Sequence, residues 1–151
     1  MLALELQASP PSASEPQDRD TTGLVTLPHF LAFWRSEMEP FDLSDRFFRV
    51  VKQRRAAAIE PLDFMPFLEE LLAYHPGLAF LEATSEFQDK YARTVIARIF
   101  YACDPSARQA IDARALRNSN VTAAFNTVDV EEDINQVANF FSYEHFYVLY
   151  W

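Results

Sequence analysis

The chain has 151 residues, of which 50% are hydrophobic and 15% aromatic, and this is ample apolar material for one domain. Its 22 acidic and 13 basic residues give a net charge of −9, which repels phosphate backbones and makes nucleic acid an unfavourable partner. We expect neither secretion nor contact with a membrane, because no stretch approaches the length of a membrane span. Cys103, the single cysteine, cannot form an internal disulfide, so a cytoplasmic location is favoured, with the nucleus as the alternative.

Large apolar side chains and a shortage of glycine predict an all-α fold. Fourteen phenylalanines stand against two glycines, a balance that favours packed helices over a turn-rich sheet. Residues 1–22 combine prolines with Ser, Glu, Asp and Gln, which predicts a disordered tail before a helical domain over residues 23–151. We expect about six or more helices after this tail and at most a very short strand pairing at the loops.

Three helices are predicted in the first half of the domain. Thr26 is a plausible cap for the first helix, and Pro40 closes it. Its apolar positions recur at helical spacing: Leu27, Phe30, Leu31, Trp34 and Met38. The same spacing marks a second helix at Leu43, Phe47, Phe48 and Val51, and a third at Phe64, Phe67, Leu68 and Leu71. The third helix stops at the His-Pro-Gly sequence that begins with His75.

Capping signals predict the helices of the second half. Ser85 and Gln88 have capping-box spacing and open a fourth helix. Its apolar stripe consists of Phe87, Tyr91, Val95, Ile99 and Cys103. A short helix is expected near residues 112–117, and Asp129 with Glu132 predicts another over about 131–141. Ser142 then caps a final aromatic helix over residues 143–151.

One stretch of sequence carries a family resemblance. EEDINQ at residues 131–136, followed by FSYEHFYVLY at 141–150, resembles the signature of the B″ regulatory subunits of protein phosphatase 2A, which contain EF-hands. The resemblance extends upstream through residues 63–81 and 86–101, and more loosely over 23–51. It implies paired EF-hand-like helix-loop-helix units with degenerate loops. In the family a second, calcium-binding hand follows the last helix, so we expect that the chain is truncated before it.

The resemblance sets the register of both loops, because an EF-hand loop carries an aliphatic residue at position eight that pairs with its counterpart: here Ile59 and Ile111. In the first loop, positions one, three, five and twelve are then Lys52, Arg54, Ala56 and Asp63. In the second loop, positions one, three, five, six and twelve are Asp104, Ser106, Arg108, Gln109 and Ala115. Calcium requires several oxygen donors and a glutamate at position twelve. We therefore expect no bound metal or other cofactor, although the family's calcium binding would be assigned by similarity; Asp104, Ser106 and Asp112 are the only candidate ligands.

No group of residues indicates catalysis, so we expect that the chain is not an enzyme. No Ser/His/Asp arrangement suggests itself, and two glycines do not allow a glycine-rich phosphate loop. The three histidines, His29, His75 and His145, fall in different helices without a cluster of acidic residues or cysteines, which disfavours zinc. Cys103 lies on an apolar stripe, where an inert buried thiol is commoner than a nucleophile.

A basic run interleaved with apolar residues offers a candidate docking edge for an acidic protein partner: Arg46, Arg49, Lys52, Arg54 and Arg55. A solvated helix face is the more common explanation of such a run. The aromatic residues Phe30, Phe33 and Trp34 are similarly ambiguous, because one helix cannot bury all three, and two are expected in the core. The candidate partner-binding residues are Phe30, Trp34, Arg46, Arg49 and Arg54.

By resemblance, the chain would be a regulatory subunit of protein phosphatase 2A. Its partners would be the helical-repeat scaffold, which it would contact through residues 23–81, and the catalytic subunit, whose substrates it would help to select. The alternative is a free-standing calcium-binding EF-hand protein, which the loop chemistry disfavours. An isolated enzyme domain lacks any supporting group of residues.

Overall fold

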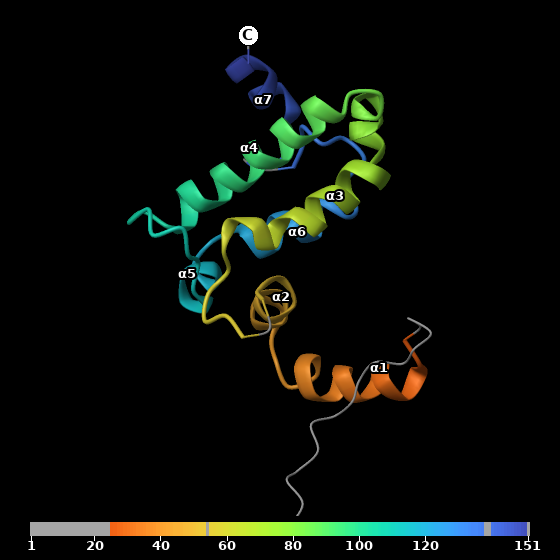
Figure 1. Ribbon diagram of the computed structural model, residues 1–151, viewed down its shortest axis with the longest axis vertical. Helices are drawn as coiled ribbons and strands as arrows, with labels where there is room; N and C mark the ends of the chain where they lie inside the picture. Colours follow the sequence, from red (N-terminus) through yellow and green to blue (C-terminus); the bar gives the residue numbers. More distant parts are fainter. Residues whose placement is uncertain (1–24, 54, 138–139, 151) are drawn as a thin grey trace, which may run out of the picture.

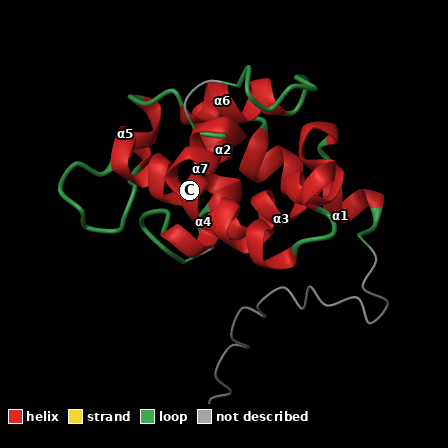
Figure 2. Ribbon diagram, turned by 90° about the horizontal axis from the view of Figure 1, so that it is seen from above, coloured by secondary structure: helices red, strands yellow, loops and turns green. Residues whose placement is uncertain are grey.

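The computed structural model describes residues 25–53, 55–137 and 140–150. Over these residues the chain forms seven α-helices, three helices of other types and no β-strand (Figures 1 and 2). The all-α prediction is therefore confirmed. The predicted disordered tail, residues 1–22, lies outside the described residues, and the domain start at residue 23 stays a prediction.

The first helix of the chain lies apart from most of the others (Figure 1). Helix α1, Leu27–Phe33, continues into a short π-helix, Trp34–Met38, and α1 itself contains no buried residue. Helix α2, Leu43–Val51, follows, with the Asp42 side chain accepting a hydrogen bond from the Asp45 amide at its start. Among the residues of α1 and the π-helix, only the last, Met38, is buried. The pair therefore forms an arm whose side chains are mostly exposed.

Helix α3, Met65–Tyr74, is preceded by a 3-10 helix, Pro61–Phe64, and followed by another, Pro76–Leu81. His75 joins α3 to the second of these, as the predicted helix stop requires. Its Nδ1 accepts a hydrogen bond from the Gly77 amide at 3.0 Å, so the neutral ring carries its proton on Nε2 and donates it to the Glu131 carbonyl at 2.8 Å. This buried histidine thus links α3 to a segment 56 residues further along the chain.

Helix α4, Ser85–Cys103, is the longest helix of the described structure and supplies much of its core. Its buried residues are Tyr91, Ala92, Val95, Ile96, Ile99, Phe100 and Cys103. The predicted Ser85 capping box does not form: Thr84 occupies the N-cap position, and the Gln88 side chain donates from Nε2 to the Leu81 carbonyl at 3.1 Å. The helix starts at Ser85 as expected, but the Gln88 side chain bonds the preceding turn and does not cap the helix.

Three further helices complete the fold: α5, Ala113–Arg117; α6, Val121–Val128; and α7, Tyr143–Tyr150. Phe125 of α6 joins the aromatic core, with ring centroids 4.9 Å from Phe47, 5.8 Å from Phe64 and 5.1 Å from Phe141. Burial of such rings supplies a large apolar area and favourable edge contacts. One aromatic cluster therefore connects α2, the start of α3, α6 and the segment before α7.

The helix predicted over residues 131–141 is wrong. The described residues 129–137 form turns, and Asp129 closes α6 rather than opening a helix. Acidic side chains bond the local backbone instead: Asp133 accepts from the Asn135 amide at 3.0 Å, and Glu131 from the Asp133 amide at 3.1 Å. Such bonds compete with helix formation. Helix α6 was not predicted, because its Val, Thr and Asn residues are weak helix formers.

Two polar residues of α4 hold the segment before α7 in place. The Tyr91 hydroxyl donates to the Phe141 carbonyl, and Arg98 donates from Nη1 to the carbonyls of Phe140 and Ser142 at 3.0 and 3.1 Å. Burial raises the pKa of Tyr91 and lowers that of Arg98. Helix α7 consequently lies against α4 (Figure 1), with Phe146 buried in the contact.

Candidate functional site

The two loops after α2 and α4 meet through a single antiparallel bridge. Ile59 and Ile111 exchange backbone hydrogen bonds, the amide of each donating to the carbonyl of the other at 2.9 Å, and both side chains are fully buried. This pairing confirms the predicted register, in which these residues occupy position eight of two facing loops. It also confirms the expectation of a minimal strand pairing.

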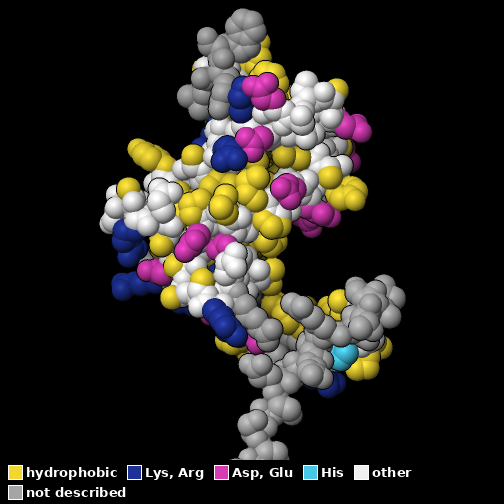
Figure 3. Space-filling model, in the orientation of Figure 1, with side chains coloured by type: hydrophobic (Ala, Val, Ile, Leu, Met, Phe, Trp, Pro, Cys, Tyr) yellow, Lys and Arg dark blue, Asp and Glu magenta, His cyan; other side chains and the backbone are white. Residues whose placement is uncertain are grey.

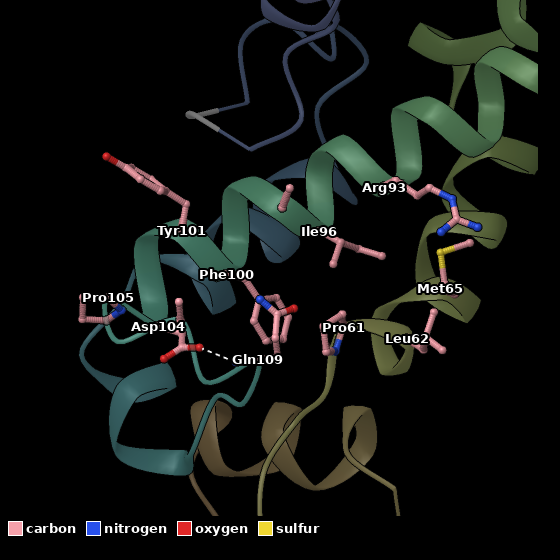
Figure 4. A pocket seen from close by; sticks show the side chains of 12 residues that line it. Pro61, Leu62, Met65, Arg93, Ile96, Phe100, Tyr101, Asp104, Pro105 and Gln109 are labelled. Atoms are coloured by element: carbon pink, nitrogen blue, oxygen red, sulfur yellow. Dashed lines mark hydrogen bonds between the residues drawn. The ribbon is translucent and has the colours of Figure 1, made fainter.

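The second loop keeps the backbone shape of a calcium loop. Gln109, at the sixth position, has φ 59°, a left-handed conformation that usually requires glycine, and Ala107 has φ 50°. The Asp104 carboxylate at the first position accepts from the Gln109 amide at 2.7 Å through Oδ2 (Figure 4). Its Oδ1 lies 3.6 Å from Nε of Arg108 and accepts no hydrogen bond. Arg108 therefore places a positive charge beside this carboxylate, from a side chain that is itself 61% exposed.

The other predicted ligands of this loop differ from Asp104, which is buried. Ser106 is exposed. Asp112 caps α5, its Oδ1 accepting from the Ala115 amide at 2.8 Å. The structure therefore places one of the three candidate carboxylate or hydroxyl groups inside the loop and uses a second for helix capping.

The first loop lacks suitable donors as well. Its first position is Lys52. The Asp63 carboxylate at its twelfth position is buried and accepts from the Glu60 amide at 2.8 Å, which caps the 3-10 helix Pro61–Phe64 that contains Asp63. Arg54 lies outside the described residues. Within the described part of the chain, no three His, Cys, Asp or Glu side chains form a group that could hold a metal. The described residues of the two loops thus supply few of the oxygens that calcium requires.

A groove of about 810 Å³ runs beside the second loop, between the start of α3 and the second half of α4. Its labelled side chains are mainly apolar, with Arg93 near one end and Asp104 near the other (Figure 4). The apolar residues include Pro61, Leu62, Met65, Ile96, Phe100 and Tyr101. Figure 3 shows apolar side chains gathered over α3 and α4 on this face. The sequence patterns did not predict this groove. The available signal was that Tyr101 and Leu62 are large apolar residues outside the predicted core stripes, and in the structure they are 88% and 71% exposed.

The arm formed by α1 and the π-helix exposes its aromatic residues. Phe30 is 47%, Phe33 49% and Trp34 41% exposed, so the expectation that two of the three lie in the core is wrong. The arm has too little of the domain beside it to cover these rings, since α1 contains no buried residue. Phe30 and Trp34 contact each other, with ring centroids 6.2 Å apart.

Two arginines of the basic run have partners inside the chain. Arg46 donates from Nε to the carbonyls of Met38 and Phe41 at 2.8 and 2.7 Å, and its guanidinium lies 5.7 Å from the Trp34 ring. Arg49 pairs with Glu37 and lies 4.1 Å from the Phe41 ring. Both side chains therefore fix the arm against α2. The sequence could not show this, because it depends on how the turn at residues 39–42 places the two helices.

The remaining reactive side chains do not form a site. His29 lies on the arm, His75 links α3 to Glu131, and His145 lies on α7. Cys103 is buried, and burial raises the pKa of its thiol, as expected for an inert cysteine. In the described residues, the groove and the arm are therefore the candidate surfaces for a partner.

Paired helix-loop-helix units whose loops meet through one bridge at position eight define an EF-hand domain. The sequence model of the EF-hand domain family matches residues 42–131, which cover both loops, and the chain belongs to this family. Membership of this family means that the two loops belong to one domain, but it does not determine whether either loop binds a metal.

Among known proteins, the chain is similar to B″ regulatory subunits of protein phosphatase 2A, as its sequence indicates. It is 42% identical over 134 residues to a probable B″epsilon subunit of Arabidopsis thaliana, covering 88% of this chain and 25% of that protein. It is 39% identical over 132 residues to the human B″ subunit alpha, covering 87% of this chain and 12% of that protein. The chain thus spans about a quarter or less of these two relatives.

A solved structure supports the same relationship. A chain in a structure described as a PP2A PR70 holoenzyme superposes with a TM-score of 0.69 at 38% sequence identity, covering 74% of this chain and 42% of that chain. At this level of identity, the agreement concerns the sequence as well as the fold. The similarity to B″ subunits is therefore found both in the sequences of relatives and in a solved structure.

Proposed function

We propose that the chain acts as a regulatory subunit of protein phosphatase 2A, binding the scaffold subunit in a complex with the catalytic subunit and directing substrate selection. The supporting observation is its 38% identity and TM-score of 0.69 to a chain of a PP2A holoenzyme. Relatives named as B″ regulatory subunits agree over 87–88% of this chain.

The exposed arm is the docking surface that we assign to the scaffold. Its exposed apolar residues are Leu27, Phe30, Leu31, Phe33 and Trp34. Aromatic residues that become covered at an interface can supply a large share of the binding energy, and Trp is among the residues enriched at such positions. An apolar face of this kind on an otherwise acidic chain favours a partner protein over solvent. The predicted candidates Phe30 and Trp34 therefore act by direct contact.

The arginines act indirectly in this proposal. Arg46 and Arg49 hold the arm through the Met38 carbonyl and the Glu37 carboxylate, so they orient Trp34 for the partner. A charge reversal at Arg49 would repel Glu37 and displace the arm. Loss of binding in such a variant would not show that the arginine touches the scaffold, and the aromatic residues are the better targets.

The test measures binding of the 151-residue chain to purified, immobilised scaffold subunit by biolayer interferometry. We compare the wild-type chain with Phe30→Ser and Trp34→Ser, and use Tyr101→Ser as the control, since Tyr101 is exposed on α4 away from the arm. Each arm variant should weaken binding by at least about tenfold, the effect of losing one well-covered aromatic. The control should bind like the wild type.

The possible outcomes test the regulatory role and the location of the docking surface separately. A wild-type chain that does not bind the scaffold at micromolar concentration would contradict the regulatory role. Full binding by both arm variants, with loss in Tyr101→Ser, would keep the role but move the docking surface to the groove between α3 and α4.

We further infer that the chain has no catalytic activity of its own and binds no calcium at micromolar concentration. Both loops lack the required oxygens, as argued above, and this also disfavours the free-standing calcium-binding alternative. Calorimetric titration with calcium, and incubation of the purified chain with p-nitrophenyl phosphate, test the two statements separately.

For location we propose the cytoplasm or the nucleus, where a phosphatase complex would meet its substrates. Among the described residues, no helix combines the length and apolar character needed to cross a bilayer. Fluorescence imaging of a tagged chain would test the location.

A further inference from the structure

The second loop combines the backbone of a calcium loop with a side chain that calcium binding excludes. Its sixth residue, Gln109, adopts a left-handed conformation, and Ile111 pairs with Ile59 as in a formed loop. Yet its fifth position, normally a ligand, is Arg108. Something other than a metal must therefore stabilise the closed backbone.

A buried carboxylate marks the place where a cation is needed. The Asp104 side chain is only 1% exposed, and its Oδ2 accepts from the Gln109 amide. Its Oδ1 is buried and accepts no hydrogen bond, which is costly for an ionised group unless a positive charge lies nearby. The Arg108 guanidinium supplies that charge, with its Nε 3.6 Å from Oδ1, although the Arg108 side chain is itself 61% exposed.

We propose that Arg108 replaces the calcium ion of the second loop and holds it permanently in the closed conformation. The guanidinium offsets the charge of Asp104 from the fifth position, where a calcium-binding loop directs a ligand toward the metal. The inference goes beyond the regulatory function and does not depend on it. Because Asp104, Ala107 and Gln109 also line the groove beside α4, the groove keeps its shape whether calcium is present or not (Figure 4).

The first test removes the internal cation. Arg108→Ala in the full chain should lower the melting temperature in EGTA by several degrees, whereas Arg108→Lys, which retains a positive charge, should recover most of the loss. The control is Arg114→Ala, which removes an exposed arginine that has no ion pair among the described residues. Equal melting temperatures for Arg108→Ala and Arg114→Ala would overturn the proposal.

A double-mutant cycle shows whether Arg108 acts through Asp104. Asp104→Asn alone and Arg108→Ala alone should each destabilise the chain, and the combined variant should lose less than the sum of the two. A strictly additive loss would mean that the two residues stabilise the chain independently, and the replacement of calcium by Arg108 would be rejected.

The second test restores the metal site and does not rely on a destabilised variant. Combining Arg108→Asp, Gln109→Gly and Ala115→Glu supplies oxygens at the first, third, fifth, ninth and twelfth positions and glycine at the sixth. The matched control carries Gln109→Gly and Ala115→Glu but keeps Arg108. Calcium at 1 mM, a concentration of about the upper limit for such sites, should raise the melting temperature of the triple variant only. A comparable rise in the control would show that Arg108 does not exclude calcium and would refute the proposal.

Discussion

Replacing Gly77 by alanine tests the contact between the 3-10 helix after α3 and the segment before α7. A Cβ atom at this position would lie 2.7 Å from the Glu132 carbonyl oxygen, 3.0 Å from the Ile134 amide nitrogen and 3.1 Å from the His75 ring. Two of these neighbours are backbone atoms, which cannot move aside as a side chain would. Overpacking of this kind costs about 1–3 kcal/mol.

The loss should appear as a lower melting temperature. For a domain of this size, each kcal/mol lowers the melting temperature by about 4 °C, so Gly77→Ala should melt about 4–12 °C below the wild type. The control is Ala79→Ser, which adds one heavy atom at an exposed position of the same 3-10 helix and should change little. Equal melting curves for Gly77→Ala and the control would refute the close approach of residues 132–134 to Gly77.

Three further predictions concern single side chains. Burial raises the pKa of Tyr91 above its ordinary value of 10.0, so its contribution to the free energy of unfolding is complete below about pH 10 and is lost as the pH rises further. Urea unfolding should therefore give a lower free energy of unfolding at about pH 11 than at about pH 9, and Tyr91→Phe should reduce this difference. Cys103 should not react with a thiol reagent such as DTNB in the folded chain and should react fully in urea, because its thiol is buried and its pKa raised; rapid labelling of the folded chain would contradict its packing. Arg46→Ala should destabilise the chain by about 1.5–3 kcal/mol through the loss of charged hydrogen bonds, and should change Trp34 fluorescence in a Trp151→Phe background; an unchanged spectrum would show that Arg46 does not position that ring.

The features that the sequence predicts well depend on local patterns. The helix stop at His75 and the apolar stripe of α4 from Tyr91 to Cys103 follow from spacing and capping chemistry, and both are confirmed. Phe87, the first residue of the predicted stripe, is 42% exposed, so that part of the prediction is wrong. The pairing of Ile59 with Ile111 follows from the loop register that the family resemblance supplied. The helix prediction failed at residues 131–137 because acidic side chains accept hydrogen bonds from the local backbone as readily as they cap a helix, and apolar periodicity does not distinguish the two cases.

The features that the sequence did not predict depend on distant contacts. Arg108 lies beside Asp104 only once the loop has closed, and Arg46 reaches the Met38 carbonyl only once the arm has turned against α2. The exposure of Trp34 likewise depends on how little of the domain lies beside the arm. Amphipathic spacing predicts which side of a helix is apolar, but not whether another element covers it.

The central claim is that this chain joins the phosphatase complex without needing calcium. The most direct measurement is size-exclusion chromatography with light scattering on the chain mixed with the purified scaffold–catalytic core of protein phosphatase 2A, in EGTA and again in 1 mM calcium. We predict a complex of one copy of each subunit in both buffers, with equal yield. Failure to co-elute with the core at micromolar concentration, or a complex that forms only in calcium, would contradict the account.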